Sequence, residues 1–303
     1  MADSAGDWPA LPLVAWRETR DTLHMYTQIV GKIKLGLMPL ERGWANVALF
    51  LTPRGFTTGA MPYGERMVQI DFDFVAHTIE LTTSDGGARS IALLPARCVA
   101  DIYVAIMAAL GALGVTLTIW PMTVEVPNPT RCDEDRVHES YDPEYVERFR
   151  RAMACIGTAF IEHRAPFRGR HTPLQFFWGT FDLAYVRFSG RDADPPPNAD
   201  RMMRIAMDAQ EIAAGFWPGD DRFPEPAFYA YAYPKPAGLE AAAIRPATAG
   251  WNASLGEFVL GYDDVRNAPS PRAALLDFLA AAYDAAATRA NWDRSLAGTA
   301  TPD

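Results

Sequence analysis

The chain has 303 residues, of which 49% are hydrophobic and 21% are charged, and its formal net charge is −9. These proportions are typical of a globular protein with enough chain to bury a large core. The negative charge, with no cluster of Lys or Arg, argues against a nucleic-acid partner and against an anionic membrane surface, because both require a basic face.

The cysteines and the apolar segments indicate in which cellular compartment the protein is expected. Three cysteines without CxxC spacing are typical of reduced thiols: Cys98, Cys132 and Cys155. The first residues lack the basic flank and apolar run of a signal peptide. Residues 102–120 carry no charge, but Gly111 and Gly114 interrupt them and basic flanks are missing. We expect a buried helix followed by a strand there, no membrane partner, and a cytoplasmic protein.

The first half of the chain predicts a helix, several strands and a second helix. In chain order, these are a helix over 15–37, strands over 45–52 and 67–74, a hairpin around Asp85-Gly86-Gly87, a helix over 96–110 and a strand over 115–126. The helix over 15–37 is stopped by Pro39, and its apolar residues recur every three or four positions. The hairpin follows from the glycines, which adopt the positive φ of a tight turn.

The second half predicts the same order of elements. After a polar connector over 127–141 we expect a helix over 142–163, a strand over 172–191, a short helix over 200–212, strands over 227–234 and 256–262, and a last helix from Ser270. Neighbouring strands without βαβ alternation predict an α+β protein with antiparallel β-meanders flanked by helices. The repeated order suggests a duplicated α–β-meander–α unit, without a residue-level repeat. We expect two halves, 1–126 and 127–303, packed as one continuous unit.

The segment 172–191, TPLQFFWGTFDLAYVRFSGR, is the longest strand-like run. Both of its faces are mostly apolar, which predicts a central strand covered on each side. Asp182 lies beside Trp178 and Thr180 on an otherwise apolar face, and a buried carboxylate there needs a partner.

Asp182 has two interpretations. It is a general acid or base, or the partner of a cationic ligand, with a raised pKa. Alternatively it is a structural aspartate bonded to the backbone or to an arginine such as Arg187. A β-bulge at Gly179 would move Asp182 to the other face of the strand.

The first helix carries a polar row at four-residue spacing, His24, Gln28 and Lys32, so that all three side chains point the same way. As a functional cluster, Gln28 and Lys32 would bind an anionic or carbonyl ligand and His24 would transfer protons. As a structural feature, the row is the solvated edge of an amphipathic helix.

The segment 227–234 places three phenols on one face of a strand: Tyr229, Tyr231 and Tyr233. The small residues of the other face let a helix pack closely. A ligand-binding surface would have this pattern, and so would ordinary cross-strand aromatic packing. Glu225, held between two prolines, could point into the same space.

Several motifs are missing from the sequence. It has no HExxH, no Walker loop, no GxGxxG after a strand and no GxSxG elbow. Nucleotide cofactors with standard fingerprints are therefore not expected, and the identity of any cofactor stays open. No metal site is predicted, and the five scattered histidines could hold a metal only through tertiary assembly.

Several segments together resemble a family of bacterial proteins known only as a domain of unknown function. The matching segments include FFWGTFDLAYVRFSGR, GFWPGD and EPAFYAYAYPKPAG, and they extend from Trp8 to just before the last helix. The resemblance implies one shared architecture and a bacterial cytoplasmic setting, but no activity, cofactor or catalytic residue. The family pattern has a histidine where this chain has Gln175, which argues against a metal site at that position.

Our functional hypothesis is that the protein binds a small aromatic or carboxylate-bearing molecule in a pocket against the sheet. The pocket is predicted to be lined by catalytic candidates His24 and Asp182 and by Gln28, Lys32, Trp178, Glu225, Tyr229 and Tyr231. A metabolic enzyme with acid–base residues and a non-catalytic binding protein both fit. The alternative is a structural or protein-interaction protein with no small-molecule site. The sequence leaves the oligomeric state open.

Overall fold

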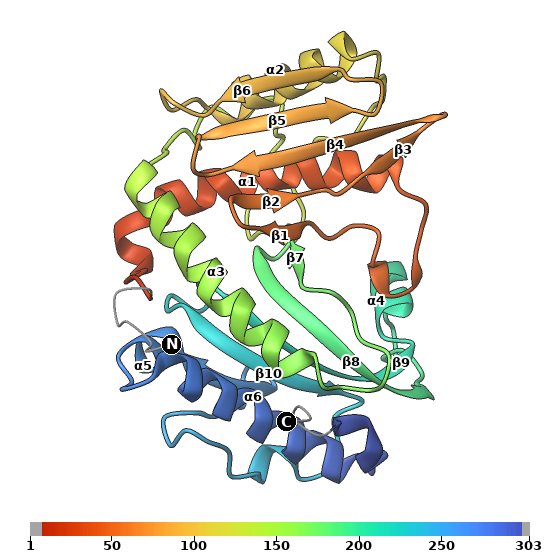
Figure 1. Cartoon of the computed structure of the whole chain (residues 1–303), viewed down its shortest axis with the longest axis vertical. Helices are drawn as coiled ribbons and strands as arrows, with labels where there is room; N and C mark the ends of the chain where they lie inside the picture. The colour runs from red at the N-terminus through yellow and green to blue at the C-terminus, as the bar shows by residue number, and fades with distance from the viewer. Residues whose placement is uncertain (1–7, 299–303) are drawn as a thin grey trace.

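The computed structural model describes residues 8–298. These residues form two six-stranded antiparallel sheets with helices packed around them, which confirms the α+β class (Figure 1). We call them the N-terminal sheet and the C-terminal sheet. In both halves the order along the chain is helix, antiparallel strands, helix, as predicted.

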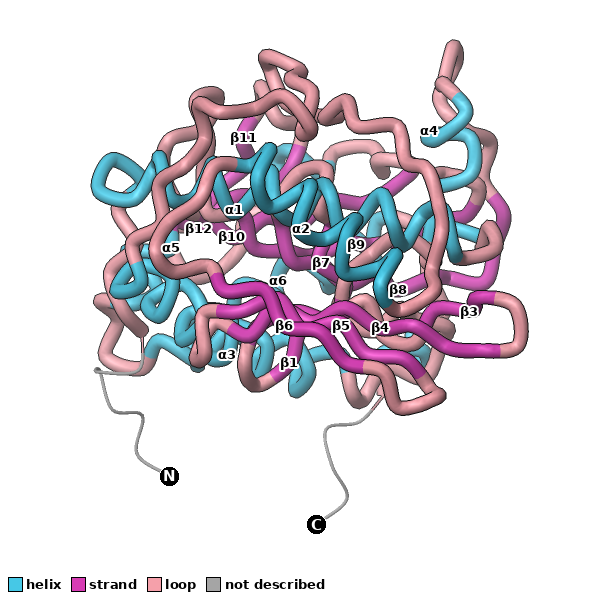
Figure 2. The backbone as a smooth tube through the Cα atoms, turned by 90° about the horizontal axis from the view of Figure 1, so that it is seen from above, coloured by secondary structure: helices cyan, strands magenta, loops and turns pink. Residues whose placement is uncertain are grey.

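The N-terminal sheet has the order β1-β2-β4-β5-β6, and β3 pairs with β4 beside that path. Its strands are β1 (Phe50–Thr52), β2 (Gly55–Thr57), β3 (Met61–Tyr63), β4 (Arg66–Asp73), β5 (Thr78–Thr83) and β6 (Ala88–Ala92). The alternation predicted for β4 is present, since Val68, Ile70 and Phe72 are buried. Seen from above, α1 and α2 lie on the same side of this sheet (Figure 2).

The C-terminal sheet has the order β11-β12-β10-β9-β8-β7. Its strands are β7 (Gln175–Phe177), β8 (Asp182–Asp192), β9 (Ala209–Trp217), β10 (Ala227–Tyr233), β11 (Gly250–Asn252) and β12 (Glu257–Gly261). Helices α3 and α6 lie together over one face of this sheet (Figure 1), which we call the helix face. The opposite face carries Tyr229 and Tyr231, and we call it the tyrosine face.

The helices of the described residues are α1 (Leu13–Leu37), α2 (Val99–Ala112), α3 (Pro143–Arg164), α4 (Arg201–Ala206), α5 (Tyr262–Arg266) and α6 (Pro271–Arg289). Every residue of α1 from 22 to 34 is buried, because the helix lies between the N-terminal sheet and the second half of the chain. The interpretation of its polar row as a solvated edge is therefore wrong.

One hydrophobic core runs through both halves. The backbone groups of Leu49 and Phe176 exchange two hydrogen bonds, of 2.9 and 2.7 Å, between the strand regions of the two sheets. The ring of Phe56 stacks on that of Phe176 with centroids 4.1 Å apart. These contacts join the edges of the sheets at β1 and β7, so aromatic packing is continuous across the predicted boundary at 126/127.

Three predicted elements are wrong in detail. The segment 172–191 is a hairpin of β7 and β8, not one strand, because the chain turns at 178–181. The segment 115–126 contains no strand, only an isolated bridge between Met122 and Arg131. The helix predicted over 200–212 ends at Ala206, and β9 follows from Ala209 because its small and apolar residues pair between β8 and β10.

Candidate functional site

The tyrosine face has a floor of small residues. Tyr229 pairs with Gly215 on β9, which pairs in turn with Ala184 on β8, and Tyr231 pairs with Ala213. The Tyr229 ring lies directly over Gly215, where a Cβ would overlap it. Tyr229 and Tyr231 are stacked, with an interplanar angle of 10° and a centroid separation of 6.4 Å. The absence of side chains on β9 thus lets the phenols lie across the sheet.

Asp182 is the most buried carboxyl group at this end of the face, with 7% of its surface exposed. The hydroxyls of Thr180 and Tyr229 both donate hydrogen bonds to it. Burial raises the pKa of Asp182, although both hydrogen bonds act in the opposite direction. No Lys or Arg among the described residues lies within 4.0 Å of this carboxylate. Its charge is therefore balanced by dipoles and not by a cation.

Two further carboxyl groups lie on the same face with strongly shifted pKa values. Burial raises the pKa of Glu257, on β12, to about 7, and Asp182 contributes to the shift. Burial also raises the pKa of Glu211, on β9, to about 7, while a weak hydrogen bond of 3.5 Å from the Tyr231 hydroxyl opposes it. The Asp182 charge thus makes ionisation of Glu257 less favourable, and the Asp208 charge does the same for Glu211.

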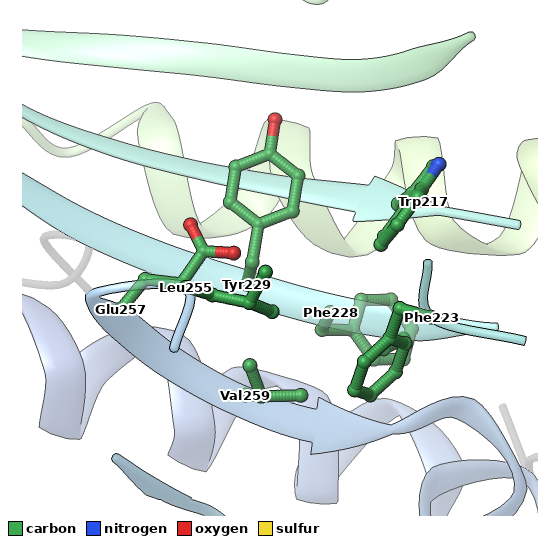
Figure 3. A pocket seen from close by; sticks show the side chains of 8 residues that line it. Trp217, Phe223, Phe228, Tyr229, Leu255, Glu257 and Val259 are labelled. Atoms are coloured by element: carbon green, nitrogen blue, oxygen red, sulfur yellow. The ribbon is translucent and has the colours of Figure 1, made fainter. Parts of the chain in front are cut away.

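A shallow hollow opens at one end of this face. It encloses about 180 Å³, open solvent included, and its main walls are Trp217, Phe223, Tyr229 and Glu257. Trp217 and Phe223 stack with centroids 5.9 Å apart. Figure 3 shows the Glu257 carboxylate and the Tyr229 ring rising side by side from neighbouring strands, with the rings of Trp217 and Phe223 at the other end of the hollow. The hollow therefore combines aromatic walls with a carboxyl that titrates near neutrality.

The 178–181 turn connects this face to α1. The imidazole Nε2 of His24 lies 3.0 Å from the Gly179 carbonyl oxygen, and the Glu125 side chain lies against the Gly179 Cα on the other side. Phe181 has a φ of 61°, which is rare for a bulky residue, and Glu125 has a φ of 58°. Strained backbone of this kind is frequent at functional sites.

The polar row of α1 is bonded to the protein itself. Burial, and next Arg20, lower the pKa of His24 to about 3, so the imidazole is neutral at physiological pH. The Gln28 amide forms hydrogen bonds of 2.8 and 3.1 Å with the backbone of Val124. The Lys32 ammonium lies over the rings of Trp120 and Trp178, 5.2 and 5.5 Å from their centroids.

The predicted site residues therefore fall into separate groups. None of His24, Gln28 and Lys32 lines the hollow, and His24 and Lys32 contact residues of the 178–181 turn. Asp182 and Tyr229 are in direct contact, but only Tyr229 lines the hollow, and Asp182 and Tyr231 lie behind its lining residues on the tyrosine face. Glu225 is exposed and lies outside the hollow lining.

Trp178 and Arg187 also occupy positions that the sequence did not indicate. Trp178 packs against Gly31 of α1 and donates a hydrogen bond of 2.9 Å to the Val47 carbonyl, so it faces the helix rather than Asp182. Arg187 lies on the helix face, because it is five residues along β8 from Asp182. The interpretation of Arg187 as the partner of Asp182 is wrong.

Sequence reasoning missed Glu211, Glu257, Glu125 and Trp217. The helix predicted over 200–212 concealed Glu211 and the start of β9. Once β9 is taken as a strand, its sequence AQEIAAGFW places Glu211, Ala213, Gly215 and Trp217 on one side, and this alternation could have found them.

The fold and this face define an α+β protein with a carboxyl-rich, aromatic-walled sheet surface. The chain belongs to the Family of unknown function (DUF5996), whose model matches residues 8–299. Searches of curated proteins and of solved structures find no match. Within residues 8–298, no helix combines the length and apolarity needed to cross a membrane. Those residues also contain no group of three or more His, Cys, Asp or Glu side chains placed to hold a metal ion.

Proposed function

We propose that this protein binds a small aromatic molecule bearing a protonated amine, on the tyrosine face of the C-terminal sheet. The observation that carries the proposal is Asp182, a buried carboxylate that is bonded to the hydroxyls of Thr180 and Tyr229 and has no ion-pair partner among residues 8–298. A buried charge without a counter-charge is costly, and a ligand cation removes that cost.

The surroundings of Asp182 support the same ligand class. Glu257 has a pKa of about 7 and adjoins aromatic rings, which bind organic cations through their faces. Burial raises the pKa of Glu125, and the negative charge of Asp182 raises it further. A ligand ammonium would lower these pKa values, so its binding would release protons near neutral pH.

Gln175 provides a neutral group on the same face. It pairs with Ala184, in the row of Gly215 and Tyr229, and its exposed fraction is 2%. Its amide nitrogen is buried and has no hydrogen-bond partner among the described residues. A ligand oxygen, such as a phenol or carbonyl, would satisfy that donor, while the ligand amine interacts with the carboxyls.

These features favour one of the two ligand types expected from the sequence. Aromatic walls fit an aromatic molecule, whereas a ligand carboxylate would face the unpaired Asp182 and Glu257. We therefore favour a cationic aromatic ligand on this face. If the bound molecule also reacts, Glu257 is suited to general acid–base catalysis, because its pKa lies near the working pH.

A matched pair of probes tests the proposal. Tyramine and 4-hydroxyphenylacetate share the phenol ring and differ in carrying an amine or a carboxylate. By calorimetric titration at pH 7, we expect tyramine to bind and 4-hydroxyphenylacetate not to bind. Tyramine binding should weaken by about tenfold or more in Glu257→Gln and Asp182→Asn, since each removes a charge-assisted interaction.

A control variant separates local from general charge effects. Glu80→Gln removes one negative charge from β5 of the other sheet and should leave tyramine binding unchanged. Equal binding of both probes, or equal weakening in Glu80→Gln and Glu257→Gln, would overturn the proposal. The structural or protein-interaction alternative would then account better for this face.

We further propose a bacterial cytoplasmic setting. The described cysteines Cys98 and Cys132 form no disulfide within residues 8–298, which is consistent with a reducing compartment. Mass measurement with and without a thiol-alkylating reagent, on protein taken directly from cells, tests this: three alkylated thiols are expected, and a disulfide would contradict it.

A further inference from the structure

The opposite face of the same sheet contains an unpaired positive charge. Arg187 projects from β8 toward α3 and α6, and 4% of its surface is exposed. Its guanidinium donates a hydrogen bond to the His163 carbonyl oxygen at the end of α3. The rings of Tyr283 and Phe167 lie 4.6 and 5.1 Å from the guanidinium carbon.

No carboxylate neutralises this charge among residues 8–298. Arg187 forms no ion pair within 4.0 Å there, although Asp284 acts on it from a greater distance. Its Nε is buried and has no hydrogen-bond partner among the described residues. Nearby Arg164 adds a second positive charge. Aromatic faces compensate a guanidinium only in part, so both a charge and a donor remain unsatisfied.

The Tyr185 hydroxyl is a second hydrogen-bond donor, and this follows from the tautomer of His163. Arg187 Nη1 lies 3.5 Å from the Nε2 of His163, and a guanidinium can only donate. On this basis we assign Nε2 as the acceptor, which puts the imidazole hydrogen on Nδ1, 2.6 Å from the Tyr185 hydroxyl oxygen. The Tyr185 hydroxyl accepts this bond and keeps its own hydrogen free to donate.

These groups border a narrow hollow between the sheet and α6. It encloses about 210 Å³, open solvent included, and its lining includes His163, Tyr185, Arg187, Leu279 and Tyr283. Apart from the polar groups named above, the walls are apolar. The hollow is thus a small space that contains a positive charge and two free hydrogen-bond donors.

We propose that this hollow is a second binding site, in which Arg187 and Tyr185 bind a small anion of the carboxylate class. The geometry matches the ligand, because a carboxylate accepts two hydrogen bonds and balances one guanidinium charge. The proposed ligand is a free anion of the size of formate or acetate, because the hollow is narrow. The site lies across the sheet from the amine site and does not depend on it.

Nuclear magnetic resonance of the Arg187 Nε–H group tests this site directly. Because the Nε–H is buried, its signal should be resolved at pH 7, and it is assigned by its loss in Arg187→Lys. We expect sodium formate to shift the signal in a saturable manner. Formamide, which is similar in size but neutral, should not shift it, and neither should sodium gluconate, whose anion is too large to enter.

Variants at other positions complete the test, because they keep the Arg187 signal that reports binding. Tyr185→Phe should weaken formate binding by about tenfold or more, the loss expected when one hydrogen bond to a charged group is removed. Arg191→Gln, which removes an exposed charge from the same strand, and Asp182→Asn should leave formate binding unchanged. Equal shifts with gluconate or formamide, no shift with formate, or unchanged binding in Tyr185→Phe would each overturn the proposal.

Discussion

The indole ring of Trp178 lies directly against Gly31 of α1, in the place that a Cβ at position 31 would occupy. Nothing but glycine at that position lets the 178–181 turn approach the helix. The same turn gives the Gly179 carbonyl its contact with His24. The Gly31–Trp178 pair therefore determines how far the C-terminal sheet lies from the central helix.

Gly31→Ala should destabilise the protein by about 1–3 kcal/mol, because the added methyl displaces the indole in a packed core. Gly36→Ala is the matched control on the same helix, where the Cβ would lie 3.5 Å from Leu117 and meet ordinary contact. It should stabilise the protein by up to about 1 kcal/mol, since alanine favours a helix. Urea unfolding measures both, and a Gly31→Ala protein as stable as wild type would contradict the packing described.

Asp182→Ala should cost on the order of 1–3 kcal/mol, because the hydroxyls of Thr180 and Tyr229 lose their acceptor. Asp182→Asn should cost less, because its oxygen still accepts one hydroxyl and it removes a buried charge. Thermal melts at pH 7 compare the two variants. Equal losses of stability in both variants would mean that the negative charge of Asp182 stabilises the fold. That result would contradict the expectation that a buried charge without an ion-pair partner is unfavourable.

Glu211 should make stability fall as the pH rises. Its pKa in the folded state is about 7 against an ordinary 4.5, so between these values the folded chain holds a proton that the unfolded chain has released. The stability that this proton provides is full below pH 4.5 and lost as the pH passes 7. Between these pH values the free energy of unfolding of Glu211→Gln should therefore rise relative to that of wild type, by at most roughly 3 kcal/mol.

Denaturant unfolding of both proteins at a series of pH values measures this gain. Glu240→Gln is the control: its hydrogen bond with Lys235 lowers the pKa of Glu240, so its difference from wild type should not grow between pH 4.5 and 7. A Glu211→Gln curve parallel to that of wild type would show that the fold does not raise the pKa of Glu211.

A fragment of residues 1–128 should not fold alone. It lacks Phe176, which bonds to Leu49 and stacks on Phe56, and it lacks Trp178, which covers α1. The exposed helix and strand edge should make the fragment insoluble or leave it without a cooperative thermal transition. A soluble fragment with a sharp melt would identify the halves as independent domains.

Elements whose signals are local were predictable from the sequence. Asp142 caps α3 by accepting hydrogen bonds from the amides of Glu144 and Tyr145, with Pro143 in the first turn. Ser270 caps α6 in the same way. These caps require only neighbouring residues, so the sequence pattern predicts them directly.

The features that failed depend on contacts distant in sequence. The segment from Phe176 to Phe181 is apolar except at Gly179 and Thr180, and Gly179 alone indicated a β-bulge within one strand and not a turn between two. Phe181 holds its positive φ because Phe149, Phe176 and His24 surround its ring. The burial of the α1 polar row also depends on later parts of the chain. Of the candidate site, the tyrosine row and Asp182 followed from strand periodicity, whereas Glu257 joined them only through the pairing of β12 with β10.

The burial of α1 between distant segments has a consequence for synthesis on the ribosome. His24 and its contact Gly179 are 155 residues apart, so the helix emerges long before the chain that covers it exists. At about 5–20 residues per second, the delay is roughly 8–30 s. During that time the side of α1 that the second half covers has no native partner. Nascent chains paused between these two points should therefore be strong substrates for ribosome-associated chaperones, and they should lose that affinity once residues 175–192 have emerged.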